Sequence, residues 1–368
     1  MRRLLVATRK GLFIYGRAAN ETWTIQQRAF IGDPVSMALH DARDDTLYAA
    51  LALGHFGCKL HRSDDQGATW TEIACPAYPP QPEDPPAPAA KDPTPWAVSL
   101  IWSLESGGSD QPGRLWCGTI PGGLFRSDDR GEHWQLVRSL WDRAERRTWF
   151  GGGFDQAGIS SICVDPRDSH TVTLGVSIGG VWRTQDDGAT WTAFGKGLRA
   201  EYTPAEHAHE FNQQDLHRLV QCPGAPEHFW VQHHNGIFVS DNACASFREI
   251  EGVAPSAFGF ALAVHPDDPA QAWFAPARID SCRVPVDGKV VVNRTRNGGL
   301  SFDTLRTGLP QDDAYDLVYR HGLACAADGR TLALGSTTGN LWCSGDGGDA
   351  WHALNLHLPP IACVAFTR

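Results

Sequence analysis

Short apolar runs separated by polar turns recur along the whole chain. In one example, apolar runs occupy residues 159–164, 171–178, 180–184 and 190–194. Runs of this length, bounded by Gly, Asn, Asp and Ser, are typical of β-strands. The pattern therefore predicts an all-β chain built from units of four short antiparallel strands.

One eight-residue phrase returns within these units. Its clear copies are SDDQGATW at 63–70, SDDRGEHW at 127–134, TQDDGATW at 184–191 and SGDGGDAW at 344–351. Two worn copies, SDNACASF at 240–247 and TRNGGLSF at 295–302, have Asn242 and Asn297 in place of the aspartate. The carboxylate can fold back onto backbone N–H groups, the glycine can take a positive φ, and the aromatic ring can anchor the turn. We expect these residues to be structural and to carry no chemistry.

The aromatic residue that ends each copy measures the repeat. The aromatic positions are Trp70, Trp134, Trp191, Phe247, Phe302 and Trp351. Their separations are 64, 57, 56, 55 and 49 residues, and a decayed copy ends at Trp23, 47 residues before the first. Such a period means one supersecondary unit stacked many times.

The two ends of the chain complete this count. Segment 360–366 looks like an inner strand with no unit after it, and 4–7, 11–15 and 23–25 look like the three strands that it lacks. Joining them closes a ring and removes exposed sheet edges. The sequence thus predicts a seven-bladed β-propeller, a single domain over 1–368, with the first and last strands in one blade.

The phrase resembles the Asp-box, S/T-x-D-x-G-x-x-W/F, of sialidase-like β-propellers, also called BNR repeats. The resemblance covers nearly the whole chain, mostly at scaffold positions, and implies a turn between the third and fourth strands of each blade. Sialidases have six blades and an early Arg-Ile-Pro motif, which this sequence lacks, and xyloglucan-degrading relatives use two propellers in one chain. The fold alone assigns no function.

Composition narrows the function classes. A net charge of −10 argues against nucleic-acid binding, which favours a basic surface. There is no run of 18 apolar residues, and the first residues look like a strand rather than a signal peptide, so we expect a cytoplasmic protein without a membrane span. The ten cysteines have no CxxC spacing, and we expect them to be free thiols.

Unusual segments all fall on the face opposite the Asp-box turns, where propeller loops carry function. Segment 75–96 contains nine prolines and is predicted to be a stiff surface insertion, either a contact strip for a protein partner or inert. Segment 138–158 brings Arg146 and Trp149 together, a pairing that suits anionic or sugar-like ligands. Ordinary loop packing is the alternative for this segment.

Histidines concentrate in two neighbouring loops, EHAHEFNQQDLH at 206–217 and QHHN at 232–235. The predicted metal ligands are His209, His217, His233, His234 and, from the equivalent loop of another blade, His55, with Glu210 completing the shell. Such imidazoles can bind Zn, Mn or Fe, or act as acid and base near neutral pH. The alternative is a set of histidines bonded to loop backbone. We expect His40, His265 and His321 to lie at inner-strand exits on the Asp-box face, as structural residues.

Other candidates begin or interrupt strands beside the predicted channel. The catalytic candidates are His217, His234, Glu210, Tyr315 and Asp316, and the substrate-binding candidates are Arg9, Arg146, Trp149 and Arg278. Three functions fit these residues. The first is a hydrolase or lyase that acts on a small anionic or polyhydroxylated molecule. The second is a non-catalytic scaffold that binds a protein or ligand, and the third is a sialidase-like glycosidase.

Overall fold

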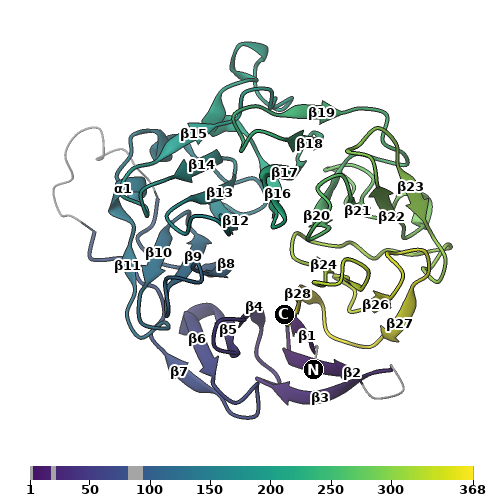
Figure 1. Ribbon diagram of the computed structural model, residues 1–368, viewed down its shortest axis with the longest axis horizontal. Coiled ribbons are helices and arrows are strands. Elements are labelled where there is room, and N and C mark those ends of the chain that lie inside the picture. The colour runs from purple at the N-terminus through teal and green to yellow at the C-terminus, as the bar shows by residue number, and fades with distance from the viewer. Residues whose placement is uncertain (1–2, 18–21, 82–93, 368) are drawn as a thin grey trace.

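Seven four-stranded antiparallel sheets surround a central axis in the computed structural model, which describes residues 3–17, 22–81 and 94–367 (Figure 1). The strands nearest the axis are β28 (Ile361–Phe366), β4 (Val35–Asp41), β8 (Leu100–Ser106), β12 (Gly158–Val164), β16 (Leu216–Cys222), β20 (Gly259–Val264) and β24 (Leu323–Cys325). The second strands are β1 (Arg3–Thr8), β5 (Thr46–Ala52), β9 (Leu115–Ile120), β13 (Val172–Ser177), β17 (Ala225–His233), β21 (Ala272–Pro276) and β25 (Leu332–Gly335). The predicted seven-bladed β-propeller is confirmed.

Two further strands complete each blade. The third strands are β2 (Gly11–Arg17), β6 (Cys58–Ser63), β10 (Leu124–Ser127), β14 (Gly180–Thr184), β18 (Gly236–Ser240), β22 (Val292–Thr295) and β26 (Leu341–Ser344). The outer strands are β3 (Trp23–Ala29), β7 (Thr71–Ile73), β11 (Gln135–Leu136), β15 (Thr192–Phe194), β19 (Arg248–Ile250), β23 (Asp303–Leu305) and β27 (His352–Asn355). Helical turns occur only in connections of the described chain: α1 (Arg138–Trp141), η1 (Gly54–Phe56), η3 (Glu145–Thr148), η4 (Ala205–His207), η5 (Phe211–Gln213) and η6 (Val286–Gly288).

The first and last strands close the ring, as the sequence predicts. β28 pairs antiparallel with β1, placing Leu4 opposite Phe366 and Val6 opposite Val364. The Thr367 N–H donates to the Arg3 carbonyl at 3.0 Å, which extends the pairing past the end of the strand. Both termini therefore lie on one blade (Figure 1).

Each copy of the eight-residue phrase forms the turn between a third and an outer strand, which we call the repeat turn. In the copy after β14, Asp186 Oδ1 accepts from the Thr190 N–H at 2.8 Å and from the Thr184 hydroxyl at 2.7 Å. The Gly188 N–H donates to the same hydroxyl at 2.9 Å, with φ at +84°. The aspartate is thus occupied by the turn itself, as expected for a structural residue.

The worn copies keep this geometry. Asn242 Oδ1 accepts from the Ser246 N–H at 2.9 Å, and Ser240 donates to the same oxygen at 3.0 Å. An amide oxygen replaces the carboxylate because the turn needs an acceptor at this position and not a charge.

Six inner strands share an irregularity near their first residues. The pairing register skips one residue in each, which marks a β-bulge. The skipped residues are Ser36, Trp102, Ser160, His217, Phe260 and Ala362. Bulges re-aim side chains, so this row of residues marks one level of the channel, at the face opposite the repeat turns.

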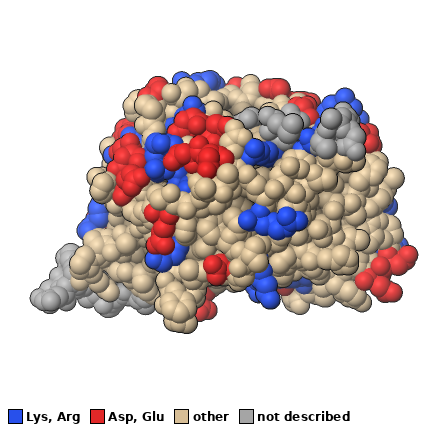
Figure 2. All heavy atoms as spheres, turned by 90° about the horizontal axis from the view of Figure 1, so that it is seen from below, with Lys and Arg blue, Asp and Glu red and all other residues tan. Residues whose placement is uncertain are grey.

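The surface charges and the cysteines do little to distinguish the three candidate functions. Figure 2 shows Lys and Arg side chains dispersed among acidic ones rather than gathered into a basic patch on the visible face. The ten cysteines are all free thiols, as expected. Across the described residues, no helix has the length and apolar character to cross a membrane.

Candidate functional site

Asp215, His217 and His234 meet at the face opposite the repeat turns. Asp215 directly precedes β16, His217 is the bulged residue of that strand, and His234 lies in the loop between β17 and β18. Asp215 Oδ2 is 3.5 Å from His217 Nε2 and 3.4 Å from His234 Nδ1. All three ligand atoms lie within 4.8 Å of one another, and they are the only such group among the described His, Cys, Asp and Glu residues.

The orientation of His217 is set by its other ring nitrogen. His217 Nδ1 lies 2.6 Å from the Gly259 carbonyl, which only accepts, so Nδ1 carries the hydrogen. The ring also stacks on Phe260, with centroids 4.3 Å apart and planes 18° apart. His217 Nε2 therefore presents its lone pair toward Asp215, and a backbone-held imidazole of this kind is how proteins orient a metal ligand.

The orientation of the Asp215 carboxylate is also fixed by its neighbours. Ser177, at the end of β13, donates to Asp215 Oδ1 at 2.9 Å and leaves Oδ2 facing the two histidines. Gly152 lies against Oδ2, because a Cβ built there would be 2.9 Å from that oxygen. The glycine allows the loop before β12 to approach the carboxylate.

Protonation states suit metal binding. Burial would raise the pKa of Asp215, but the His217, His234 and Arg320 side chains outweigh it and hold the pKa well below its usual range. Burial lowers the pKa of His217, against the attraction of Asp215. At neutral pH the site thus contains a carboxylate and a neutral imidazole, which are the forms that bind metals.

His234 is the member nearest to solvent. Its side chain is 21% exposed, whereas those of Asp215 and His217 are each 3% exposed. Tyr202 and Phe258 contact the ring edge-on, with centroid separations of 5.1 and 5.8 Å. Burial and the charge of Asp215 raise the pKa of Tyr202, so its hydroxyl stays protonated and donates to the Gln213 carbonyl at 2.5 Å.

Two residues before β24 cross the channel to opposite blades. The Arg320 guanidinium carbon lies 4.5 Å from the centroid of the Trp102 ring in β8. His321 Nε2 donates to the Ser160 carbonyl in β12 at 3.0 Å. His321 was expected at an inner-strand exit on the repeat-turn face. That placement is wrong, because His321 precedes its inner strand and is buried inside the channel.

Burial, together with the nearby charges of Arg218 and Arg320, lowers the pKa of His321 well below its usual range. The unfolded chain takes up a proton below about pH 6.5 and the native protein does not, so stability falls by up to about 1.4 kcal/mol per pH unit below that point. His321→Gln keeps a donor for Ser160 and cannot titrate. Urea denaturation at about pH 7 and about pH 5 should therefore show a smaller acid-induced loss in the variant than in wild type. An equal loss in both proteins would contradict a neutral, buried His321.

The other predicted metal ligands do not join the group. His209 Nδ1 bonds to the Leu198 carbonyl at 2.9 Å, and Glu210 pairs with His207 at 2.5 Å. His233 is fully buried and packs on Phe238, because successive residues of β17 face opposite sides, and burial lowers its pKa to about 3. His55 packs against the adjacent exposed Phe56 in a different blade.

Structural roles account for Asp316, and two predicted arginines are exposed. Asp316 Oδ1 accepts hydrogen bonds from Ser336 and Asn340, each at 2.8 Å. Arg9 and Arg278 are exposed, and neither contacts the three-residue group. Tyr315 is 64% exposed and lies on the segment that leads to β24.

Arg146 and Trp149 are packing residues in this structure. Arg146 is 5% exposed, donates to the Trp141 carbonyl at 2.9 Å and lies over the Trp141 ring at 4.1 Å. It also donates to Thr94 at 3.2 Å, and Tyr78 contacts Trp141, so these side chains hold both described ends of the proline-rich insertion. Residues 82–93 of that insertion lie outside the described chain. Trp149 is buried against Trp182.

Three residues at or next to the candidate site were not assigned a role in it from the sequence: Asp215, Ser177 and Arg320. Asp215 lies within the histidine-rich segment, two residues before His217, a spacing that puts both side chains on one side of an extended chain. Ser177 and Arg320 lie in distant blades, and only the closed ring brings them to this point.

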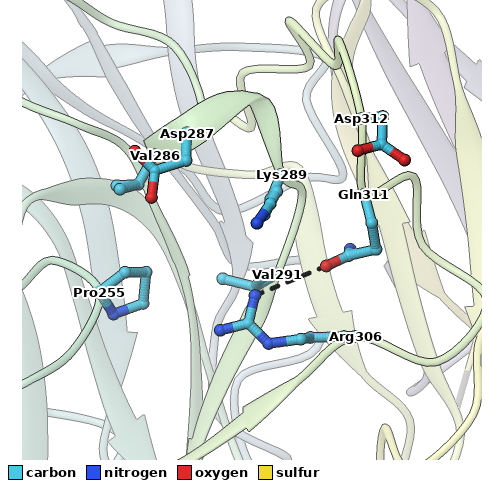
Figure 3. Close-up of a pocket in the computed structure, with 8 residues that line it drawn as sticks. All are labelled: Pro255, Val286, Asp287, Lys289, Val291, Arg306, Gln311 and Asp312. Carbon is cyan, nitrogen blue, oxygen red and sulfur yellow. Dashed lines mark hydrogen bonds between the residues drawn. The ribbon is translucent and has the colours of Figure 1, made fainter.

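A hollow lined by other residues is also present on the described surface. A cavity of about 360 Å³ is lined by Pro255, Val286, Asp287, Lys289, Val291, Arg306, Gln311 and Asp312 (Figure 3). Arg306 Nη1 donates to Gln311 Oε1 at 3.5 Å, and the Lys289 N–H donates to the Val286 carbonyl at 3.1 Å. The cavity has charges of both signs and no metal-ligand group, so the channel mouth is the stronger candidate.

Sequence comparison finds only short similarities. No protein-family model matches the chain. An 82-residue segment, 22% of the chain, is 33% identical to a probable oligoxyloglucan-reducing end-specific xyloglucanase of Neosartorya fischeri, and 85 residues, also 22%, are 35% identical to the Emericella nidulans enzyme of that name. Each match spans 9% of the relative's length.

Structural comparison finds propellers. An ancestral GH74 enzyme aligns with a TM-score of 0.56 and 14% identity over 84% of this chain and 36% of its own. YCF48 from Cyanidioschyzon merolae aligns at 0.55, with 12% identity over 88% and 86% of the two chains. YCF48 bound to D1 peptide aligns at 0.52, with 14% identity over 87% and 81%. These likenesses support the propeller fold and no more, because the sequences have diverged.

Proposed function

We propose that this propeller is a metal-dependent hydrolase or lyase that acts on a small anionic or polyhydroxylated, sugar-like molecule at the channel mouth. The observation that carries the proposal is the group of Asp215, His217 and His234. Ligands bound to one zinc ion at about 2.0–2.2 Å lie about 3.4 Å apart in a tetrahedral shell. The separations of 3.5 and 3.4 Å from Asp215 Oδ2 match that spacing.

Three protein ligands leave coordination positions for water and substrate, which is the arrangement of catalytic rather than structural metals. A divalent ion there would polarise a substrate oxygen and lower the pKa of a bound water. Two imidazoles and one carboxylate suit Zn, Mn or Fe. His234 and Tyr202 would face the reacting molecule from the solvent side.

Aromatic side chains around the mouth support a sugar-like substrate. Phe154, Tyr202 and Tyr319 are 48%, 37% and 39% exposed. Phe154 packs against Trp102 and Tyr319 against Phe260, so both lie beside bulged residues of the channel. The local similarity to xyloglucanases, over 22% of the chain, agrees with this substrate class. The geometry of the six repeat turns supports placing the chain among Asp-box propellers.

Metal content is the test of this function. Wild type dialysed against a mixture of Zn²⁺, Mn²⁺ and Fe²⁺ should retain close to one ion per chain. His217→Ala and His234→Ala should each retain at least about 10-fold less, because each loses a direct ligand. His357→Ala, which removes an exposed histidine outside the group, is the matched control and should bind like wild type. A metal-free wild type whose melting temperature ignores all three ions would exclude the proposal.

A further inference from the structure

Arg320 is a buried cation with no carboxylate in direct contact. The residue is 6% exposed, and no Asp or Glu oxygen of the described chain lies within 4.0 Å of its guanidinium. Its Nε has no hydrogen-bond partner, and its Nη2 donates a weak 3.5 Å bond to Ser177 Oγ. Arginine is rarely buried unless it is paired, because an uncompensated charge is costly to remove from water.

Two aromatic rings hold this guanidinium in place. Its central carbon lies 4.5 Å from the Trp102 centroid and 5.4 Å from the Phe260 centroid. Both rings belong to bulged positions of inner strands, so the channel wall itself fixes the cation. The N–H groups that remain unbonded are therefore preorganised for a ligand.

Arg320 also adjoins the proposed metal site. Ser177 Oγ accepts from Arg320 and donates to Asp215 Oδ1 at 2.9 Å, so one hydroxyl bridges the cation and the carboxylate. With a divalent ion bound, the single negative charge of Asp215 would be opposed by the two positive charges of the ion and the one of the guanidinium. The pocket would then carry net positive charge and attract an anion.

We propose that Arg320 binds the carboxylate of a small ligand whose neighbouring oxygen binds the metal, which makes the substrate an α-hydroxy carboxylate. The metal contact rests on the proposed function, whereas the arginine contact stands without it. A flat carboxylate can accept two parallel N–H bonds from a guanidinium held between rings. A phosphate can accept the same pair of bonds, so inorganic phosphate is titrated as the competing anion.

Calorimetric titration with three small probes tests the pairing. Glycolate has both groups, acetate has only the carboxylate, and ethylene glycol has only hydroxyls. Metal-loaded wild type should bind glycolate at least about 10-fold more tightly than acetate, and ethylene glycol not detectably. Arg320→Gln should weaken glycolate binding at least about 10-fold, and Arg320→Lys should bind with intermediate affinity because it keeps the charge and loses the fork.

The matched control is Arg283→Gln. Its guanidinium lies over the same Phe260 ring at 5.4 Å but is paired with Asp280, so its loss should leave glycolate binding unchanged. Circular dichroism checks that each variant folds. If Arg320→Gln does not fold, the glycolate affinity of Arg320→Lys provides the test. Glycolate binding that ignores Arg320, or phosphate binding tighter than glycolate, would overturn the inference.

The same titrations separate this inference from the metal site. Glycolate and acetate binding with equal, Arg320-dependent affinity in loaded and chelator-treated protein would support the arginine contact and contradict the metal. Glycolate binding that requires the metal but survives Arg320→Gln would support the metal and contradict the arginine contact.

Discussion

Asp215→Asn is expected to lower the affinity for divalent metal at least about 100-fold, because the carboxylate faces both histidines and is the only anionic ligand of the group. The amide oxygen keeps the size of the side chain and its bond from Ser177, so the fold should persist. Isothermal titration with Zn²⁺ and Mn²⁺ measures the change directly.

Asp316→Asn is the control for that experiment. Asp316 is also buried, and it also accepts from a serine hydroxyl, Ser336, at 2.8 Å. It has no histidine partner, so its replacement should leave metal affinity unchanged. Equal losses in the two variants would mean that a general loss of structure, and not a ligand, explains the effect.

Removal of residues 361–368 is expected to abolish cooperative folding. The deletion takes away β28, exposes the edge of β1 and removes the buried side chains Ile361 and Val364. Each such side chain contributes about 1.5–3 kcal/mol. Together with the lost strand pairing, this is comparable to the whole stability of a typical domain, about 5–15 kcal/mol. Urea denaturation followed by tryptophan fluorescence provides the measurement.

A circular permutant separates ring closure from simple shortening. Linking residue 368 to residue 1 and opening the chain at the exposed Gly252 keeps all four strands of the closing blade. The permutant should unfold cooperatively with a midpoint near that of the full chain. A truncated chain that unfolds at the same midpoint would show that β28 does not close the ring.

The repeat made the fold predictable from sequence. The spacing of Trp70, Trp134 and Trp191 gives the blade length, and the turn chemistry around Asp186 is local enough to be inferred from eight residues. Ring closure was also predictable, because the first blade lacks an inner strand and the last residues supply it. Blade length, turn geometry and ring closure could be predicted because they follow from local patterns of residues along the chain.

The candidate site was only partly predictable. His217 and His234 could be found because histidines cluster in the two loops that lead to one mouth. His209 and His233 look equivalent in the sequence, but one bonds to loop backbone and the other faces a blade interior. Which histidine enters the channel depends on the bulge in β16, and a one-residue register shift leaves no clear mark in the sequence.

Arg320 illustrates a different limit. Its partners Trp102 and Ser177 lie in other blades, more than 140 positions earlier in the chain. Only the diameter of a seven-bladed ring places them together. For Arg146 the sequence suggested a site that the structure does not form. The tryptophans near it in the sequence suggested a ligand-binding site, but Arg146 lies over the Trp141 ring and bonds to Thr94 at the end of the proline-rich insertion.

Anomalous diffraction from crystals grown with Zn²⁺ or Mn²⁺ is the most direct test of the metal site. The expected result is one strong peak within about 2.0–2.2 Å of His217 Nε2, His234 Nδ1 and Asp215 Oδ2, absent from Asp215→Asn crystals. Full metal occupancy elsewhere on the chain with no peak between these three side chains would contradict it.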